Sequence, residues 1–104
     1  NTFAWNGYTV MALPGSRVYK DAVSSGQEVP KNYEGYSFHS YETKPLPTES
    51  LTPQQILRFR DEAWLTYHTY PPFLDNIEKT HGKKIRQNIE DMTKIKLKRK
   101  ILGD

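Results

Sequence analysis

Hydrophobic residues in the first part of the chain form one continuous run, Tyr-Thr-Val-Met-Ala-Leu, over residues 8–13. A short run of this kind, ended by a Pro-Gly turn, predicts a β-strand that is buried on both faces, as in parallel sheets. Ser16 is a suitable N-cap for a helix that Gly26 would end. We therefore expect residues 1–26 to form a strand, a turn and a helix, like the last repeat of an α/β domain.

The second half of the chain carries the spacing of amphipathic helices. Apolar residues recur there at steps of three and four, which is typical of one buried helix face. Thr52 is placed as an N-cap, with proline next to it and glutamine three residues later, as in a capping box. A Pro-Pro pair and then Gly82 divide the remainder. The pattern predicts three helices, over residues 52–70, 72–81 and 83–93, which would pack as a small helical bundle.

The first of these helices has a predicted core face. An apolar stripe is expected at Ile56, Phe59, Ala63, Tyr67 and Tyr70, and Leu57 and Trp64 would widen it. Leu65 falls on the opposite side among charged residues, so we expect it to contact another part of the protein. The adjacent Asp61 and Glu62 are expected to form surface ion pairs with Arg58.

Residues 27–50 contain three prolines and a polar, aromatic stretch at 33–41, and no long regular element is predicted there. Irregular segments of this length in compact proteins tend to be functional or disordered. Tyr36, His39 and Tyr41 offer rings with polar tips, as ligand pockets often do. The alternative is a loop that its aromatic residues pin to the surface. The residues leave both interpretations open.

The expected strand at residues 8–13 has no partner elsewhere in the sequence. A strand buried on both faces would leave its backbone groups unpaired without neighbouring strands. We therefore expect those strands in a part of the protein that precedes Asn1, which would make this chain a fragment, or else pairing of the strand with a second copy of the chain. The expected fold is mainly α, with three segments at 1–26, 27–50 and 51–104, and the middle one is a long irregular loop.

Positive charge is concentrated at the C-terminal end of the chain. Residues 1–78 carry six Lys and Arg against nine Asp and Glu, whereas residues 79–104 carry nine against three. Residues 83–100 could form a basic module that binds nucleic acid or an acidic protein. Basic and apolar residues alternate there without a base-reading element, which favours a solvated face or a dock onto the rest of the protein. The spacing over residues 94–102 leaves helix and strand equally open.

Motifs for catalysis, metal binding and membrane insertion are missing from the sequence. With no cysteine, the chain cannot form a Cys-ligated zinc or iron–sulfur site. Its three histidines lack the short spacing of paired ligands, so no metal site is predicted. Neither glycine-rich phosphate-binding motif occurs. No run approaches the roughly 20 apolar residues that a membrane span needs, so we expect a cytoplasmic protein without membrane contact.

Three blocks of the sequence, in this order, resemble one family. Residues 11–19, Met-Ala-Leu-Pro-Gly-Ser-Arg-Val-Tyr, resemble the end of a radical SAM barrel, where a late strand leads into a Pro-Gly-Ser/Thr-x-x-Tyr turn and a helix. Residues 33–43, Tyr-Glu-Gly-Tyr-Ser-Phe-His-Ser-Tyr-Glu-Thr, with Pro-Leu-Pro-Thr at 45–48, and then residues 57–64, Leu-Arg-Phe-Arg-Asp-Glu-Ala-Trp, resemble the region after the barrel. Nearly the whole chain is similar to the C-terminal region of cobalamin-binding radical SAM proteins, the Fe–S oxidoreductases of the anaerobic magnesium-protoporphyrin ester cyclase type.

This resemblance implies a larger enzyme, an oxidoreductase or methyltransferase, that cleaves S-adenosylmethionine reductively at a [4Fe–4S] cluster and uses the radical on a small-molecule substrate. Cobalamin is a further cofactor of the group. The family's CxxxCxxC motif is missing here, so this chain would bind no cofactor and hold no catalytic residue. It would close the barrel's edge and cover the substrate opening, with the upstream barrel as its partner. The loop at 33–43 would lie near the end of the barrel that carries active sites, which makes Tyr36, His39 and Tyr41 the expected substrate-binding residues. A small complete enzyme built on His39 is the least favoured hypothesis.

Overall fold

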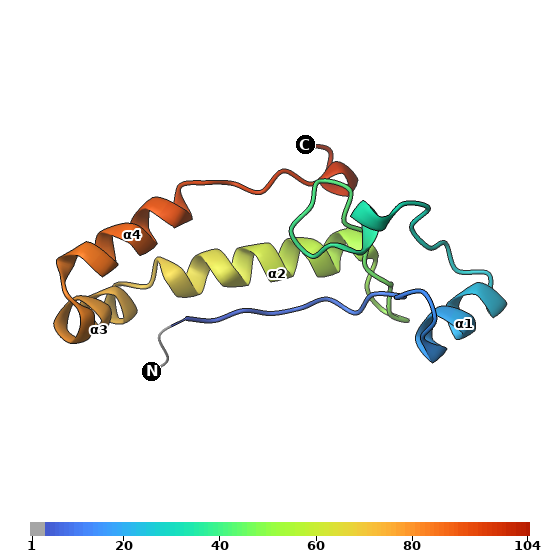
Figure 1. Cartoon of the computed structure of the whole chain (residues 1–104), viewed down its shortest axis with the longest axis horizontal. Coiled ribbons are helices and arrows are strands. Elements are labelled where there is room, and N and C mark those ends of the chain that lie inside the picture. The colour runs from blue at the N-terminus through green and yellow to red at the C-terminus, as the bar shows by residue number, and fades with distance from the viewer. Residues whose placement is uncertain (1–3) are drawn as a thin grey trace. The chain divides into compact units, whose positions relative to one another are not determined.

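The computed structural model describes residues 4–104, and this part of the protein is mainly helical (Figure 1). Four α-helices and two short 3₁₀ helices follow one another within residues 4–104: α1 (Arg17–Ser24), η1 (Tyr33–Tyr36), α2 (Pro53–His68), α3 (Pro71–His81), α4 (Lys83–Thr93) and η2 (Lys100–Leu102). Residues 4–104 contain no β-strand. The expectation of a mainly α fold is therefore confirmed.

The helices begin and end at the residues whose chemistry marks them in the sequence. The Ser16 hydroxyl accepts a hydrogen bond from the Tyr19 amide at 3.1 Å and so caps α1. Thr52 and Gln55 form the predicted capping box before α2: the Gln55 amide donates to the Thr52 hydroxyl at 3.2 Å, and the Thr52 amide donates to the Gln55 side chain at 2.9 Å. Gly82, at φ 95°, occupies a backbone conformation that other residues rarely adopt and separates α3 from α4.

The predicted strand at residues 8–13 is wrong. The segment is extended but belongs to no strand, and only Met11 and Ala12 within it are buried. Tyr8 and Val10 are each 64% exposed, so the segment is not covered on both faces. The Val10 carbonyl accepts one hydrogen bond from the Leu46 amide at 2.9 Å. An apolar run predicts burial only if neighbouring strands are present to pair with it, and residues 4–104 provide none. The turn and the helix that were expected after the strand are formed.

The chain is divided into two compact units. The helical unit comprises residues 4–7 and Arg60–Lys96, and the loop unit comprises Tyr8–Phe59 and Leu97–Asp104. Helix α2 contributes its first residues to the loop unit and the rest to the helical unit.

The helical unit has a small apolar core between α3 and α4, which pack against each other (Figure 1). Its buried members are Phe73, Leu74, Ile77 and Ile89, with Tyr67 and Ile85 partly buried against them. On the surface, Arg86 of α4 pairs with Asp75 of α3 at 2.7 Å and with Glu90 at 2.8 Å. These pairs, with the hydrogen bond to Glu90 as the largest cause, raise the pKa of Arg86. The charged residues therefore reinforce the same two-helix contact as the core.

The buried face of α2 differs from the predicted stripe. Phe59 is 73% exposed and Tyr70, which follows the helix, is 56% exposed, although both were expected in the core. Leu57, which was expected to widen the stripe, is buried as predicted, and the other two buried residues of α2 are Arg60 and His68, which were not expected there. A count of hydrophobic residues cannot find this face, because two of its three members are polar and are buried together with hydrogen-bonding partners.

The basic segment after α4 is neither a helix nor a strand in its central part. Residues 96–99 are irregular and lead into η2, which settles the alternatives that the spacing over 94–102 left open. No helix within residues 4–104 combines the length and the apolar character that crossing a membrane requires.

Candidate functional site

The three residues expected to bind a substrate lie in or next to η1, in the loop unit. Tyr36 is half-buried, and its hydroxyl donates to the Pro30 carbonyl at 3.1 Å. Burial, and to a smaller extent the neighbouring Tyr19 phenol, raises the pKa of Tyr36 above its ordinary value of 10.0. The Tyr41 hydroxyl donates to the Asp104 carbonyl at 2.8 Å. Each phenol thus donates to a different backbone carbonyl. His39 lies on the loop between them, and its side chain is exposed.

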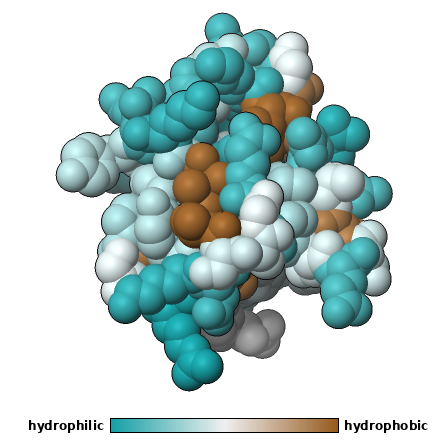
Figure 2. Space-filling view, turned by 90° about the vertical axis from the view of Figure 1, so that its right-hand side faces the viewer, coloured by the Kyte–Doolittle hydropathy of each residue, from teal (hydrophilic) through white to brown (hydrophobic). Residues whose placement is uncertain are grey.

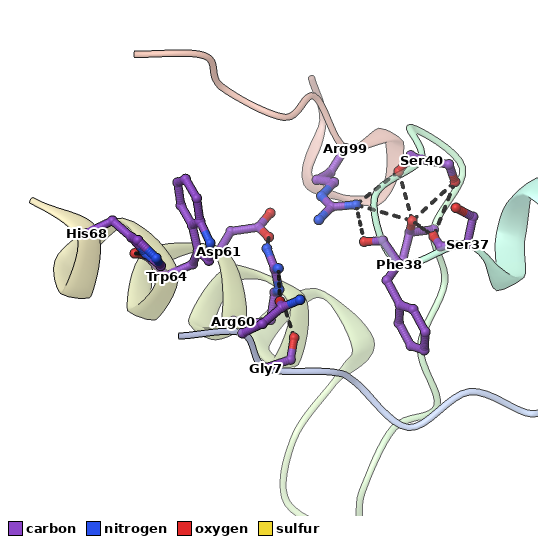
Figure 3. A network of polar contacts seen from close by, with 11 residues as sticks. Gly7, Ser37, Phe38, Ser40, Arg60, Asp61, Trp64, His68 and Arg99 are labelled. Carbon is purple, nitrogen blue, oxygen red and sulfur yellow. Dashed lines mark hydrogen bonds and ion pairs between the residues drawn. The ribbon is translucent and has the colours of Figure 1, made fainter. Parts of the chain in front are cut away.

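Arg99 organises this loop from the C-terminal end of the chain (Figure 3). Its side chain is completely buried. The Nη1 atom donates to the carbonyl oxygens of Phe38 at 2.8 Å and Ser40 at 3.0 Å, and lies 3.2 Å from the Thr43 hydroxyl oxygen. A buried guanidinium is tolerated only when its donors are satisfied, and here backbone carbonyl dipoles converge on the charge. Arg99 therefore fixes a loop that lies about 60 residues earlier in the sequence, at separations of 56 to 61 residues.

Thr43 completes the network on the other side of the loop. It is as buried as Arg99, and its hydroxyl hydrogen-bonds the carbonyl oxygens of Ser37 and, at 2.8 Å, Ser40. The Ser40 hydroxyl in turn donates to the Glu34 carbonyl. These contacts close the segment into a compact turn in which the carbonyl groups of Phe38 and Ser40 point toward Arg99 (Figure 3). After η1, the conformation of residues 37–43 is therefore set by side-chain hydrogen bonds within the segment and from Arg99.

The segment Arg99–Asp104 is joined to the loop by its backbone as well. The Lys100 amide donates to the Tyr41 carbonyl at 2.8 Å, and the Lys100 ammonium lies 3.4 Å from both carboxylate oxygens of Glu42. The Asp104 carboxylate accepts from the Arg99 amide at 2.9 Å. Phe38 adds a ring contact with Tyr8, at a centroid distance of 4.8 Å. Hydrogen bonds and aromatic contacts together hold the loop in place.

Sequence reasoning missed Arg99, which was counted among the cations of a solvated or docking tail. One signal could have identified it. Arg99 is the only arginine in a run whose other basic residues, from Lys94 to Lys100, are all lysine. Arginine is the residue of choice for buried, multiply hydrogen-bonded sites, because its planar group offers five donors in fixed directions and stays charged.

A second polar cluster, in the helical unit, holds residues 5–7 against α2. The Arg60 side chain donates to the Gly7 carbonyl at 3.0 Å and to the Asn6 side chain at 2.9 Å. It also forms an ion pair with Asp61 at 3.0 Å (Figure 3). The sequence had predicted that Asp61 pairs with Arg58. The cluster explains why an arginine is buried on α2, since its donors meet backbone and side-chain oxygens there.

His68 belongs to the same cluster, and its hydrogen bonds define its tautomer. Its Nδ1 lies 2.8 Å from the Trp64 carbonyl, which can only accept, so Nδ1 carries the proton. The backbone amide of Trp5 can only donate, and His68 Nε2 accepts its hydrogen bond at 3.4 Å. The ring also stacks on Trp64 at 4.4 Å. His68 is buried and both of its ring nitrogens contact backbone groups, whereas the side chain of His39 is exposed to solvent, where a ligand can reach it.

The residues that the structure describes offer no ligand set for a metal ion or an iron–sulfur cluster. Within residues 4–104, no three His, Cys, Asp or Glu side chains come together as a metal site. An iron–sulfur cluster is held by cysteine thiolates, and the sequence has no cysteine, so these residues do not fit a [4Fe–4S] group. No chemistry at such a cluster can be assigned to them. The loop can instead present an imidazole and aromatic rings to a ligand from a fixed backbone.

Comparison with known proteins identified no matching family model, no matching curated protein and no matching solved structure.

Proposed function

We propose that this chain is the C-terminal subdomain of a radical SAM enzyme of the cobalamin-binding type, and that it covers the substrate opening of the catalytic barrel. It performs no chemistry by itself. The parent's other residues hold the [4Fe–4S] cluster, S-adenosylmethionine and cobalamin, and the loop at 33–43 contacts the small-molecule substrate. The proposal starts from the three sequence blocks that resemble this family, and two features of the loop unit support it.

The main supporting observation is apolar surface on the loop unit. Five large hydrophobic residues of the extended segment and α1 are 44% to 64% exposed: Tyr8, Val10, Leu13, Val18 and Val23. Helix α1 buries only Ala22, and within residues 4–104 only α3 and α4 pack together as helices. Seen from the side of α1, hydrophobic side chains reach the surface among polar ones (Figure 2). An amphipathic helix ordinarily buries its apolar face against another element. Such a surface suits a docking partner, and the parent's barrel is the partner we propose.

A second supporting observation is the fixed loop at 33–43. Binding residues are often found on loops that a rigid scaffold positions. Here the buried Arg99 and Thr43 supply that support, and His39 remains exposed. A loop that is already ordered loses little conformational entropy when a ligand binds, which favours a binding role. This role is compatible with a chain that contributes substrate contacts and no cofactor ligands.

The contacts of the basic segment weigh against the alternative function, a basic module for nucleic acid or an acidic protein. Arg99 is buried, Lys100 pairs with Glu42, and Lys94 lies 3.7 Å from Asp91. These charges are partly neutralised within the fold, which leaves fewer to displace counterions from a polyanion. Binding of generic RNA or DNA with submicromolar affinity that falls steeply with salt would favour the module instead.

The proposal is tested first by the residues encoded upstream of Asn1. A CxxxCxxC motif followed by alternating strands and helices is expected there, and a coding region without them would refute the proposed parent.

The role of the loop is tested in the full-length protein, purified without oxygen and reconstituted with iron and sulfide. His39→Ala should keep the substrate-independent cleavage of S-adenosylmethionine but lose most substrate turnover, because the proposed substrate contact is removed and no cofactor ligand is changed. His81→Ala is the matched control, since it deletes an exposed imidazole at the end of α3 in the helical unit. Equal substrate turnover in the two variants would contradict a substrate-binding loop.

A further inference from the structure

We infer that Arg99 is the positioning residue of the loop at 33–43, and that it sets the direction in which His39 meets the substrate. The inference rests on the proposed function, because it assigns a role within the same site. Its basis is that one nitrogen atom of Arg99 binds the carbonyl groups on both sides of His39.

The hydrogen bonds of Arg99 flank His39 in the sequence. Its Nη1 donates to the Phe38 carbonyl at 2.8 Å and to the Ser40 carbonyl at 3.0 Å (Figure 3). Each carbonyl is part of a planar peptide group, so a hydrogen bond to its oxygen restricts the rotation of the whole group. The Phe38 carbonyl belongs to the peptide group that leads into His39, and the Ser40 carbonyl to the peptide group between Ser40 and Tyr41. Arg99 therefore holds the backbone directly before His39 and one residue after it. Its Cα–Cβ bond leaves the loop in a defined direction, and the side chain is exposed there.

The arrangement depends on a buried guanidinium. Arg99 has no exposed surface, whereas Lys100, the next residue, has an exposed side chain that pairs with Glu42 at 3.4 Å. Arginine stays protonated when buried and directs several donors within one plane. A lysine ammonium is a compact, more strongly hydrated charge that loses its proton more readily when buried. Two neighbouring cations thus hold the same loop, but only Arg99 binds the carbonyls beside His39.

A pre-positioned imidazole affects substrate binding in a recognisable way. Because the loop is ordered before the substrate arrives, binding does not have to pay for ordering it. Weakening the Arg99 contacts should therefore raise the KM for the substrate, while cleavage of S-adenosylmethionine without substrate stays the same. The effect should also depend on His39, because Arg99 acts through that side chain.

The structural part of the inference is tested by NMR relaxation on the 104-residue chain. Wild type and Lys100→Gln should show backbone order parameters near 0.85 at residues 38–40, whereas Arg99→Gln should lower them below about 0.6. Arg99→Lys should give intermediate values. Thr43→Val serves as a second variant if Arg99→Gln does not fold, because it removes the hydroxyl that hydrogen-bonds Arg99 and the loop carbonyls at little change in volume. A loop that stays rigid in both Arg99→Gln and Thr43→Val overturns the inference, whatever the parent does.

The functional part is tested by a double-mutant cycle in the full-length enzyme. Arg99→Lys should raise the KM about tenfold in the wild-type background but less than about twofold when His39 is already alanine. Equal effects in both backgrounds would show that Arg99 does not act through His39, and would overturn the inference. If the loop becomes mobile in Arg99→Gln but His39→Ala leaves substrate turnover unchanged, the substrate contact of the proposed function is refuted. The conclusion that Arg99 orders the loop would still stand.

Discussion

Replacing Ile77 of α3 by alanine should destabilise the helical unit more than the same change on its surface. Ile77 is 1% exposed and lies in one core cluster with Phe73, Leu74 and Ile89. Ile→Ala removes three carbon atoms, and at about 0.8 kcal/mol for each buried carbon the lost transfer free energy is about 2.4 kcal/mol. The cavity that remains adds to this value, so that such substitutions cost about 2–5 kcal/mol. Because the core lies between only two helices, partial collapse is expected, and we predict a loss of about 3 kcal/mol.

The assay is urea unfolding followed by circular dichroism at 222 nm. With a slope of about 1–3 kcal/mol per molar urea, the predicted loss lowers the unfolding midpoint by about 1–3 M. Ile95→Ala is the matched control, because it deletes the same atoms from a side chain that is 72% exposed. Its free energy of unfolding should change by no more than about 0.5 kcal/mol. Indistinguishable midpoints for the two variants would refute the assignment of Ile77 to the core.

Two further predictions concern the caps and charges around the loop unit. Thr52→Ala removes the hydroxyl that accepts from the Gln55 amide and should lower the free energy of unfolding by about 1 kcal/mol, whereas Thr66→Ala, at an exposed position inside α2, should not lower it. The Lys44 ammonium lies 2.8 Å from the Glu28 carboxylate. Its hydrogen bond, and to a smaller extent its positive charge, lower the pKa of Glu28 below the ordinary 4.5. This pair therefore stabilises the fold above pH 4.5, and its contribution is lost as the pH falls through the lowered pKa. Lys44→Met should return the Glu28 midpoint in an NMR titration toward 4.5, and an unchanged midpoint would contradict the pairing.

The helices could be predicted from the sequence because their limits are set locally. The capping box at Thr52 acts within three residues, and the turn at Gly82 depends on the conformational freedom of one residue. Proline at the start of α3 likewise acts on its own helix. Signals of this kind need no knowledge of the rest of the fold. The bounds of α2, α3 and α4 therefore fall within two residues of the predicted ones.

The strand and the buried face of α2 could not be predicted, because each depends on groups that are distant in the sequence. Residues 8–13 have the composition of a buried strand, but a strand forms only where another backbone pairs with it. On α2, Arg60 is buried because the Gly7 carbonyl and the Asn6 side chain, 53 and 54 residues earlier, accept its hydrogen bonds. A prediction from the spacing of hydrophobic residues assigns a charged residue such as Arg60 to the surface. The predicted buried face of α2 was therefore wrong mainly because it left out the buried polar residues Arg60 and His68.

The basic segment at residues 94–100 also depends on groups that are distant in the sequence. From the sequence, Arg99 adds one more charge to a run of lysines, and its effect on a distant loop cannot be inferred from that run. In the structure its charge is buried among loop carbonyls, so it contributes to the order of the loop rather than to attraction of an external partner. A neutral substitution at Arg99 and one at Lys100 remove the same net charge, yet only the first takes a donor from the carbonyls beside His39. A function carried by net charge would respond equally to both changes, whereas a function carried by the loop would respond to Arg99.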